Sequence, residues 1–257
     1  MTRRPLICID PGHGNYDSGA VGPSGTKEKD ITLAVGLKTG ALLQAAGMSV
    51  VYTRTSDQVP WPADVNKDLA KRCQIANDAG ADVFVSIHCN SAVNVTAKGN
   101  ETYTFPGQGN ADALANCIHA RIKAAFPELT YREDWSDGDP DKEASFYVLK
   151  YTKMPAVLSE LAFISNPVEE KMLASEEFQD KAALAIARGI GDYLGVAIPE
   201  PVKQSGVSAA VDTLVASGVI GSPDYWLNNA QPGKTVSGEN VAALIQKMAA
   251  KIQEMEE

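Results

Sequence analysis

The 257-residue chain lacks the features of a membrane protein or a nucleic-acid-binding protein. No apolar run approaches the roughly 20 residues of a membrane-spanning helix, and PLICID (residues 5–10) is too short for a signal-peptide core. Basic residues are outnumbered, with 23 Lys and Arg against 32 Asp and Glu and a net charge of -9. Because sequence-independent binding to DNA or RNA needs a basic surface, we expect neither a nucleic-acid partner nor a membrane partner.

Cysteine and histidine are scarce as well. The four cysteines are Cys8, Cys73, Cys89 and Cys117. They form no CxxC pair, which favours buried free thiols over disulfides or metal ligands. Of the three histidines, His119 lies inside an expected helix, where packing accounts for it. His13 and His88 therefore remain as candidates for chemistry.

Expected strands and helices alternate along most of the chain. The expected strands cover residues 5–10, 48–54, 83–90, 101–105 and 155–164. The expected helices cover residues 30–46, 66–79, 110–126 and 167–194, the last as one helix or two. This alternation predicts an α/β fold with a parallel or mixed sheet covered by helices on both faces. Functional groups in such folds gather beyond the carboxyl ends of the strands.

The end of the chain differs in composition. We expect a main domain over residues 1–196, a linker with two prolines over 197–206, and a small α-helical module over 207–257. Two amphipathic helices joined by a turn that contains Gly, Pro and Trp are expected in the module. A piece of this size holds little core alone, so it should pack on a partner, either a second copy or the main domain.

Four residues are candidates for a reaction centre. His13 follows the first expected strand, His88 closes the third, and Glu28 precedes a helix. Each alone has an ordinary explanation, such as a hydrogen-bonded strand-end His or an acid favoured by a helix dipole. Glu160 stands in the apolar strand PAVLSELAF, where a carboxylate is costly unless it is paired, metal-bound or protonated. Together the four fit a zinc hydrolase with two imidazoles and one carboxylate on the metal and a second carboxylate as proton acceptor.

A phosphate-binding loop is the alternative for IDPGHGNYDSG, residues 9–19. The stretch matches neither GxxxxGK[ST] nor GxGxxG, and a helix does not follow it directly. Its two aspartates, Asp10 and Asp17, would also repel phosphate. The glycines are better explained by a sharp turn that delivers His13.

Four motifs in order resemble a known family. They are IDPGHGNYDSGAVG, KEKDITLAVGLKTGALLQAAGMSVVYTR, KRCQIANDAGADVFVSIHCNS and MPAVLSELAFISNPVEEKML, within residues 5–196. The chain resembles the zinc-dependent N-acetylmuramoyl-L-alanine amidases of the Amidase_3 type. This resemblance implies a mixed, mostly parallel sheet flanked by helices, similar to zinc carboxypeptidase-like hydrolases.

The resemblance also implies roles for individual residues. It makes His13, Glu28 and His88 the ligands of one Zn²⁺ and Glu160 the catalytic carboxylate. Asn90 belongs to the SIHxN pattern, and strand alternation would put it on the face of His88, in contact with substrate or with a ligand. Asp10 or Asp17 would orient a ligand histidine, or only shape the turn.

The implied reaction is hydrolysis of the amide between N-acetylmuramic acid and L-alanine in peptidoglycan. Peptidoglycan is therefore the expected binding partner. We expect an endolysin that is made in the cytoplasm without a signal peptide and reaches the wall after holin-mediated release. A sporulation or mother-cell lysis amidase, and a zinc peptidase that cuts within the stem peptide, are the alternatives. The C-terminal module would bind the wall or form a homo-oligomer through its helices.

One segment departs from the family's usual pattern. Residues 127–148 (PELTYREDWSDGDPDKEASFYV) are acidic, and we expect a loop at the rim of the site. Arg132 or Trp135 in this loop would contact glycan or peptide, or the loop would simply be solvated.

Overall fold

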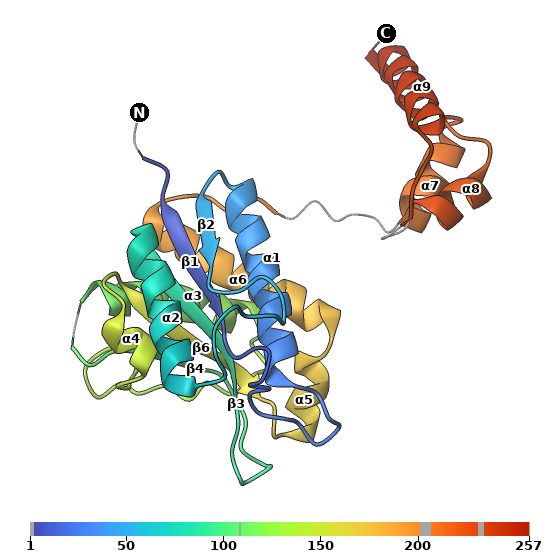
Figure 1. The fold of residues 1–257 in the computed structure, drawn as a ribbon. Helices are drawn as coiled ribbons and strands as arrows, with labels where there is room; N and C mark the ends of the chain where they lie inside the picture. Colours follow the sequence, from blue (N-terminus) through green and yellow to red (C-terminus); the bar gives the residue numbers. More distant parts are fainter. Residues whose placement is uncertain (1–2, 108, 201–206, 231–233, 257) are drawn as a thin grey trace. The chain divides into compact units, whose positions relative to one another are not determined.

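The computed structural model describes residues 3–107, 109–200, 207–230 and 234–256 (Figure 1). Contacts divide the chain into two compact units, Met1–Pro199 and Glu200–Glu257. Of the expected linker 197–206, residues 201–206 lie outside the described residues. No helix in the described ranges has the length and apolarity needed to cross a membrane.

The first unit is built on one six-stranded sheet with the order β2-β1-β3-β6-β4-β5. The strands are β1 (Leu6–Pro11), β2 (Ser49–Tyr52), β3 (Val83–Asn90), β4 (Glu101–Thr104), β5 (Lys142–Glu143) and β6 (Ala156–Phe163). Neighbours from β2 to β6 are parallel, β4 runs antiparallel to β6, and β5 is parallel to β4. The predicted mixed, mostly parallel sheet is confirmed.

The helices of this unit cover both faces of the sheet. They are α1 (Glu28–Ala45), α2 (Val65–Ala79), α3 (Asn110–Ala125), α4 (Tyr147–Tyr151), α5 (Pro167–Leu173) and α6 (Glu176–Leu194). Strand alternation divides the apolar side chains between the faces. Ile7 and Ile9 join the core under α1, α3 and α6, whereas Cys8 and Phe84 join a smaller core with α2 and α4.

Local signals explain where the helices begin and end. Asp64 caps α2 by accepting from the Lys67 amide (3.0 Å), and Gly80 ends it in the left-handed conformation with φ of 64°. The expected helix over 167–194 is two helices, because Ser175 interrupts it and caps α6 at the Phe178 amide. The four cysteines are free, and Cys8, Cys73 and Cys89 are buried.

Two expectations for local structure were incomplete. The segment 127–148 is not only a loop, because it contributes β5 to the sheet and leads into α4. The C-terminal unit has three helices among its described residues rather than two: α7 (Val207–Ala216), α8 (Pro223–Asn229) and α9 (Gly238–Glu256). Helix α8 forms within the expected turn, with Pro223 in its first turn and Trp226 packed against a small core with Val211 and Ile220.

Helices α3 and α6 pack closely at Gly189. A Cβ added there would lie 2.5 Å from the Ile118 Cα atom, which is backbone and cannot rotate away. We expect Gly189→Ala to destabilise the unit by about 1–3 kcal/mol through overpacking, although alanine favours a helix. Urea unfolding measures the loss. Gly109→Ala is the control, since an added Cβ meets no atom within 4 Å there. An unchanged midpoint for Gly189→Ala would show that the two helices do not need this approach.

Candidate metal centre

Three side chains from separate segments meet beyond the carboxyl ends of β1 and β3. His13 follows β1, Glu28 opens α1 and His88 lies near the end of β3. One ligand atom from each lies within 4.8 Å of the others, and no other such group of His, Cys, Asp or Glu was found within the described part of the chain. The structure therefore brings together the three residues that the sequence suggested.

Glu28 is the centre of this group. Its Oε1 atom lies 3.0 Å from His13 Nε2 and 3.0 Å from His88 Nδ1. The amides of Ala20 and Cys89 donate to its two oxygens at 2.9 Å each, so the carboxylate is held in place. Burial works against ionisation, but the two imidazoles outweigh it and hold the pKa of Glu28 well below its usual range.

The donor set fits a divalent zinc ion. Two imidazole nitrogens and one carboxylate are a ligand set typical of catalytic zinc, which leaves a coordination position open. The two rings stand edge to face with centroids 4.8 Å apart, and both side chains are partly exposed. Burial lowers the pKa of His13, but the neighbouring carboxylates of Glu28 and Asp17 outweigh burial and raise this pKa to about 9.

The turn that carries His13 adopts an unusual backbone conformation. His13 and Asn15 have φ of 62° and 51°, and Gly14 between them has φ of 128°. Left-handed conformations are unfavourable for residues other than glycine and persist only where the surroundings enforce them. The turn is therefore held by contacts from other elements.

Two buried arginines supply those contacts. Arg54 donates to the carbonyls of Pro11 (2.9 Å) and Gly12 (2.8 Å). Arg72, from α2, donates to the carbonyls of Pro11 (2.9 Å) and His13 (2.6 Å). Three consecutive carbonyls are thus satisfied by guanidinium groups, and His13 is aimed at Glu28 and His88.

Two glycines leave room for the side chains of His88 and Glu28. A Cβ on Gly12 would lie 2.3 Å from the His88 ring, and a Cβ on Gly19 would lie 2.6 Å from Glu28 Oε2. Gly19 also has φ of 63°. These two positions require glycine both for close approach and, at Gly19, for backbone conformation.

The two aspartates of the first motif have different places. Asp17 Oδ2 lies 2.7 Å from His13 Nδ1, on the ring edge opposite the nitrogen that faces Glu28. Asp10 is buried, pairs with Arg72 (2.8 Å) and accepts from Thr53 and Ser86. Of the two, only Asp17 is positioned to orient a ligand histidine.

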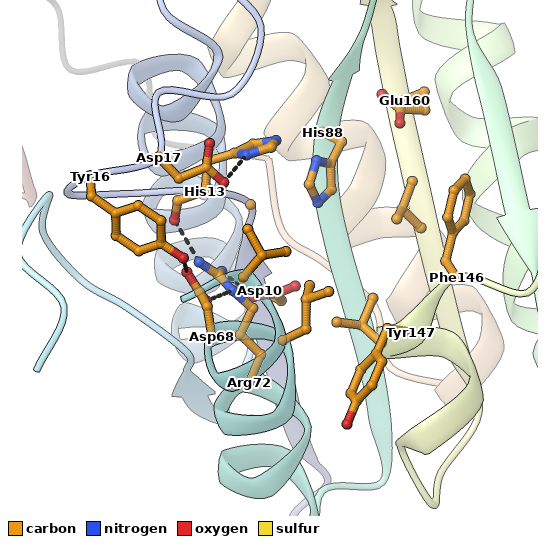
Figure 2. Close-up of a pocket in the computed structure, with 15 residues that line it drawn as sticks. Asp10, His13, Tyr16, Asp17, Asp68, Arg72, His88, Phe146, Tyr147 and Glu160 are labelled. Atoms are coloured by element: carbon orange, nitrogen blue, oxygen red, sulfur yellow. Dashed lines mark hydrogen bonds and ion pairs between the residues drawn. The ribbon is translucent and has the colours of Figure 1, made fainter. Parts of the chain in front are cut away.

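Glu160 lies beside His88 on the neighbouring strand. The two are paired in the parallel register of β3 and β6, and Figure 2 shows both side chains at the same end of the pocket. The Oε2 atom of Glu160 is buried and has no hydrogen-bond partner. Burial and the nearby carboxylates of Glu28 and Glu101 raise the pKa of Glu160 to about 8. This side chain is able to hold or release a proton near neutral pH.

Asn90 lies at the edge of this arrangement. The register of β3 and β6 shifts between His88 and Asn90, so simple alternation does not relate the two side chains. The Asn90 amide donates to Glu101 Oε2 (2.5 Å), and Glu101 pairs with Glu160 in the register of β4 and β6. A role in substrate contact stays a prediction.

A cleft of about 240 Å³ adjoins the group. His13, His88 and Glu160 lie at one end, and Phe146 and Tyr147 stand across from Tyr16 and Asp68 (Figure 2). The remaining wall is largely apolar, with Val65, Leu69, Val148 and Leu158. The site can therefore take a ligand with an apolar part next to the polar centre.

Other residues stand outside the group or were not anticipated. His119 is buried beside Thr102 and Glu133, as packing predicted, and does not join the centre. Arg54 and Arg72 were not anticipated from the sequence, although the position of Arg72 between Leu69 and Ala76 on the apolar stripe of α2 was a signal for a buried cation.

Comparison with known proteins identifies the family. The profile of Amidase_3, described as N-acetylmuramoyl-L-alanine amidase, matches residues 7–192. The chain belongs to this family. The amidase AmiC of Neisseria meningitidis is 33% identical over 234 residues, covering 76% of this chain and 54% of that protein. The endolysin of Bacillus phage SPP1 is 35% identical over 208 residues, covering 79% of this chain and 69% of that protein.

Solved structures of amidases share the fold. The catalytic domain of CwlV from Bacillus (Paenibacillus) polymyxa is 38% identical with a TM-score of 0.66, covering 75% of this chain and 99% of that domain. Family membership relates this chain to the N-acetylmuramoyl-L-alanine amidases. It spans only about half of the Neisseria amidase, so details of substrate and biological role are treated as proposals below.

Replacing Arg72 tests the support of the His13 turn. Arg72→Met leaves Asp10 and Asp68 without their buried cation and the His13 carbonyl without its guanidinium donor, while the Pro11 carbonyl keeps only Arg54. We expect a loss of about 3–5 kcal/mol in the free energy of unfolding. Arg121→Met is the matched control, because its pair with Asp192 is exposed and should contribute less than about 1 kcal/mol. Equal losses in urea unfolding would contradict the assigned role of Arg72.

Proposed function

We propose that this amidase hydrolyses the amide between the lactyl group of N-acetylmuramic acid and L-alanine of the stem peptide, with one Zn²⁺ held by His13, Glu28 and His88. The observation that carries the proposal is the placement of Glu28 Oε1 at 3.0 Å from a nitrogen of each histidine, with Glu160 on the neighbouring strand. Zinc, when bound, would supply Lewis-acid activation of water and polarisation of the amide carbonyl.

Glu160 is the proposed proton carrier. Water adds to the carbonyl carbon, the carbon–nitrogen bond breaks, and the alanine nitrogen leaves as an amine. Glu160 would accept a proton from the water and return it to this nitrogen. Its buried Oε2 atom has no competing partner in the protein.

Asp17 and the arginines would position the histidines. Asp17 faces His13 Nδ1, which favours a tautomer that presents Nε2 toward Glu28. The guanidinium of Arg72 at the His13 carbonyl supports the same orientation from the backbone side. Asn90, through Glu101, would support the wall beside Glu160.

The proposed role is that of an endolysin acting on the bacterial wall from the cytoplasmic side after the membrane is opened. The similarity to the SPP1 endolysin supports this role, and a mother-cell lysis amidase is the close alternative. Expression inside bacteria, with and without chloroform permeabilisation of the membrane, tests how the protein reaches the wall. An endolysin requires permeabilisation for the culture to clear, whereas clearing without it would contradict this route.

We further propose that the C-terminal unit mediates binding to the wall or to a second copy. The observation that favours a second copy is a stripe of exposed apolar side chains on α9: Val241, Ile245, Met248 and Ile252. Their spacing of four, three and four residues is that of a helix seam. Light scattering of the full chain tests this, since a monomer at all concentrations would leave wall binding as the remaining proposal.

Digestion of purified peptidoglycan tests the reaction itself. We expect zinc-loaded protein to release intact stem peptides with a free L-alanine amino group, detected by mass analysis, and zinc-free protein to release none. New amino groups inside the stem peptide would instead establish a peptidase.

Glu160→Gln tests the proton carrier. We expect turnover to fall by about 10²–10⁴-fold, because the amide cannot exchange a proton, while the bound zinc stays at one per chain. The exposed Glu128→Gln is the control for the same chemical change. Full activity of Glu160→Gln would remove this residue from the mechanism.

A further inference from the structure

The acidic segment that the proposed reaction does not use contains a regular series of carboxylates. Asp137, Asp139 and Asp141 recur at every second residue, and Asp141 directly precedes β5. Alternate aspartates in a loop are a common source of ligands for calcium, as in positions 1, 3 and 5 of an EF-hand loop. Lys142 stands where that loop has glycine, so this is not an EF-hand.

Part of the series is buried together with a fourth aspartate. Asp141 and Asp112, from the first turn of α3, are each only 3% exposed. Thr104 on β4 donates to Asp141 Oδ2 (2.7 Å), but the other oxygen, Oδ1, is buried and has no hydrogen-bond partner. An ionised carboxylate with an orphaned buried oxygen is costly unless a cation or a proton compensates it.

The neighbouring carboxylates increase this cost. Burial, an approach of the Asp139 carboxylate to hydrogen-bond range, and the charge of Asp112 raise the pKa of Asp141 to about 8. Asp112 is itself partly compensated, because it accepts from the Gly109 amide at the start of α3. The carboxylates of Asp139 and Asp141 thus approach each other within the cluster.

The basic side chains of the same segment are engaged elsewhere. Lys142 Nζ lies 2.9 Å from Glu101 Oε1, and Arg132 pairs with the same oxygen. Lys123 pairs with Glu133. These three cations serve carboxylates outside the aspartate cluster, so the compensating charge has to come from another source.

We propose that Asp139 and Asp141, with Asp112 beside them, form a calcium site that fastens the segment 134–143 to the edge of the sheet. The donors are all oxygens, which suits calcium and not zinc, whose sites favour nitrogen and sulfur. Among the described residues, only His13, Glu28 and His88 form a group of three or more His, Cys, Asp or Glu with ligand atoms close enough to hold a metal, so the aspartates would supply only part of a calcium shell. Calcium takes about six to eight oxygens in flexible geometry, so backbone carbonyls and water would complete its shell.

The site would act on the cleft through β5. The Ala144 amide donates to the Thr104 carbonyl (2.9 Å), and Phe146, two residues on, lines the cleft. Thr104 is therefore joined both to the aspartate cluster and to the strand that leads to the cleft wall. Calcium would hold this wall in place without touching the zinc ligands.

Terbium luminescence provides a direct test, because Tb³⁺ occupies calcium sites and is excited by nearby tryptophan. Trp135 lies in the same segment. We expect zinc-loaded full chain to show saturable Tb³⁺ emission that CaCl2 competes away and that Trp135→Phe removes. In calcium-free buffer with zinc retained, added millimolar CaCl2 should raise the unfolding temperature by about 2–6 °C.

Variants decide which residues are responsible. Asp139→Asn and Asp141→Asn should each weaken calcium binding at least about tenfold, whereas the exposed Asp78→Asn should bind as the wild type does. Asp139 is only partly buried, so its variant tests the site even where Asp141→Asn fails to fold.

Three results would overturn the proposal: no thermal shift with CaCl2, an equal shift with MgCl2, or an unchanged calcium shift in both variants. If both variants unfold at a higher temperature and neither responds to calcium, a proton shared between Asp139 and Asp141, and not a cation, would compensate their charge. None of these readouts depends on amidase activity, so the calcium site and the proposed reaction stand or fall separately.

Discussion

The arrangement of the centre depends on the hydrogen bonds from two buried guanidinium groups to one turn of backbone. Arg54 and Arg72 reach the carbonyls of residues 11–13 from different elements and hold His13 in a conformation that it would not adopt alone. Arg72 is in turn balanced by Asp10 and Asp68, both buried. Burying these charges is tolerable only because nearly every donor of the guanidinium finds an acceptor. Precision at His13 is thus obtained from ionic groups that bond to the backbone of its turn.

The sheet contributes a second constraint, because it fixes where Glu160, the proposed proton carrier, lies. His88 and Glu160 are register partners on adjacent parallel strands, so the spacing of the strands sets their separation. Much of the rest of the cleft wall comes instead from α2 and from Phe146, Tyr147 and Val148 at the start of α4. The residues of the proposed reaction and much of the cleft wall therefore come from different parts of the fold.

Much of this could be predicted from the sequence. Strand and helix alternation predicted the α/β sheet, and the strand-end positions of His13 and His88 predicted that they meet. The contacts of residues whose partners are distant in sequence could not be predicted in the same way. The choice between Asp10 and Asp17 depends on which one faces a histidine, and the register shift after His88 depends on pairing with β6. Strand β5 has only two residues, too few for a periodic pattern, and forms because β4 offers it an edge.

The alternation of β3 also governs which atoms are available at the centre. Cys89 is the next residue after His88, yet its thiol belongs to the core on the face under α1, α3 and α6, and burial raises its pKa well above the usual value. The thiol stays protonated and turned away, and only its amide reaches Glu28. The proposed ligand set of His13, Glu28 and His88 would therefore bring a single carboxylate to a metal, where a thiolate would have added a second negative charge. A divalent ion held by these residues would keep net positive charge, and with it the electron-withdrawing strength that a sulfur ligand would have quenched.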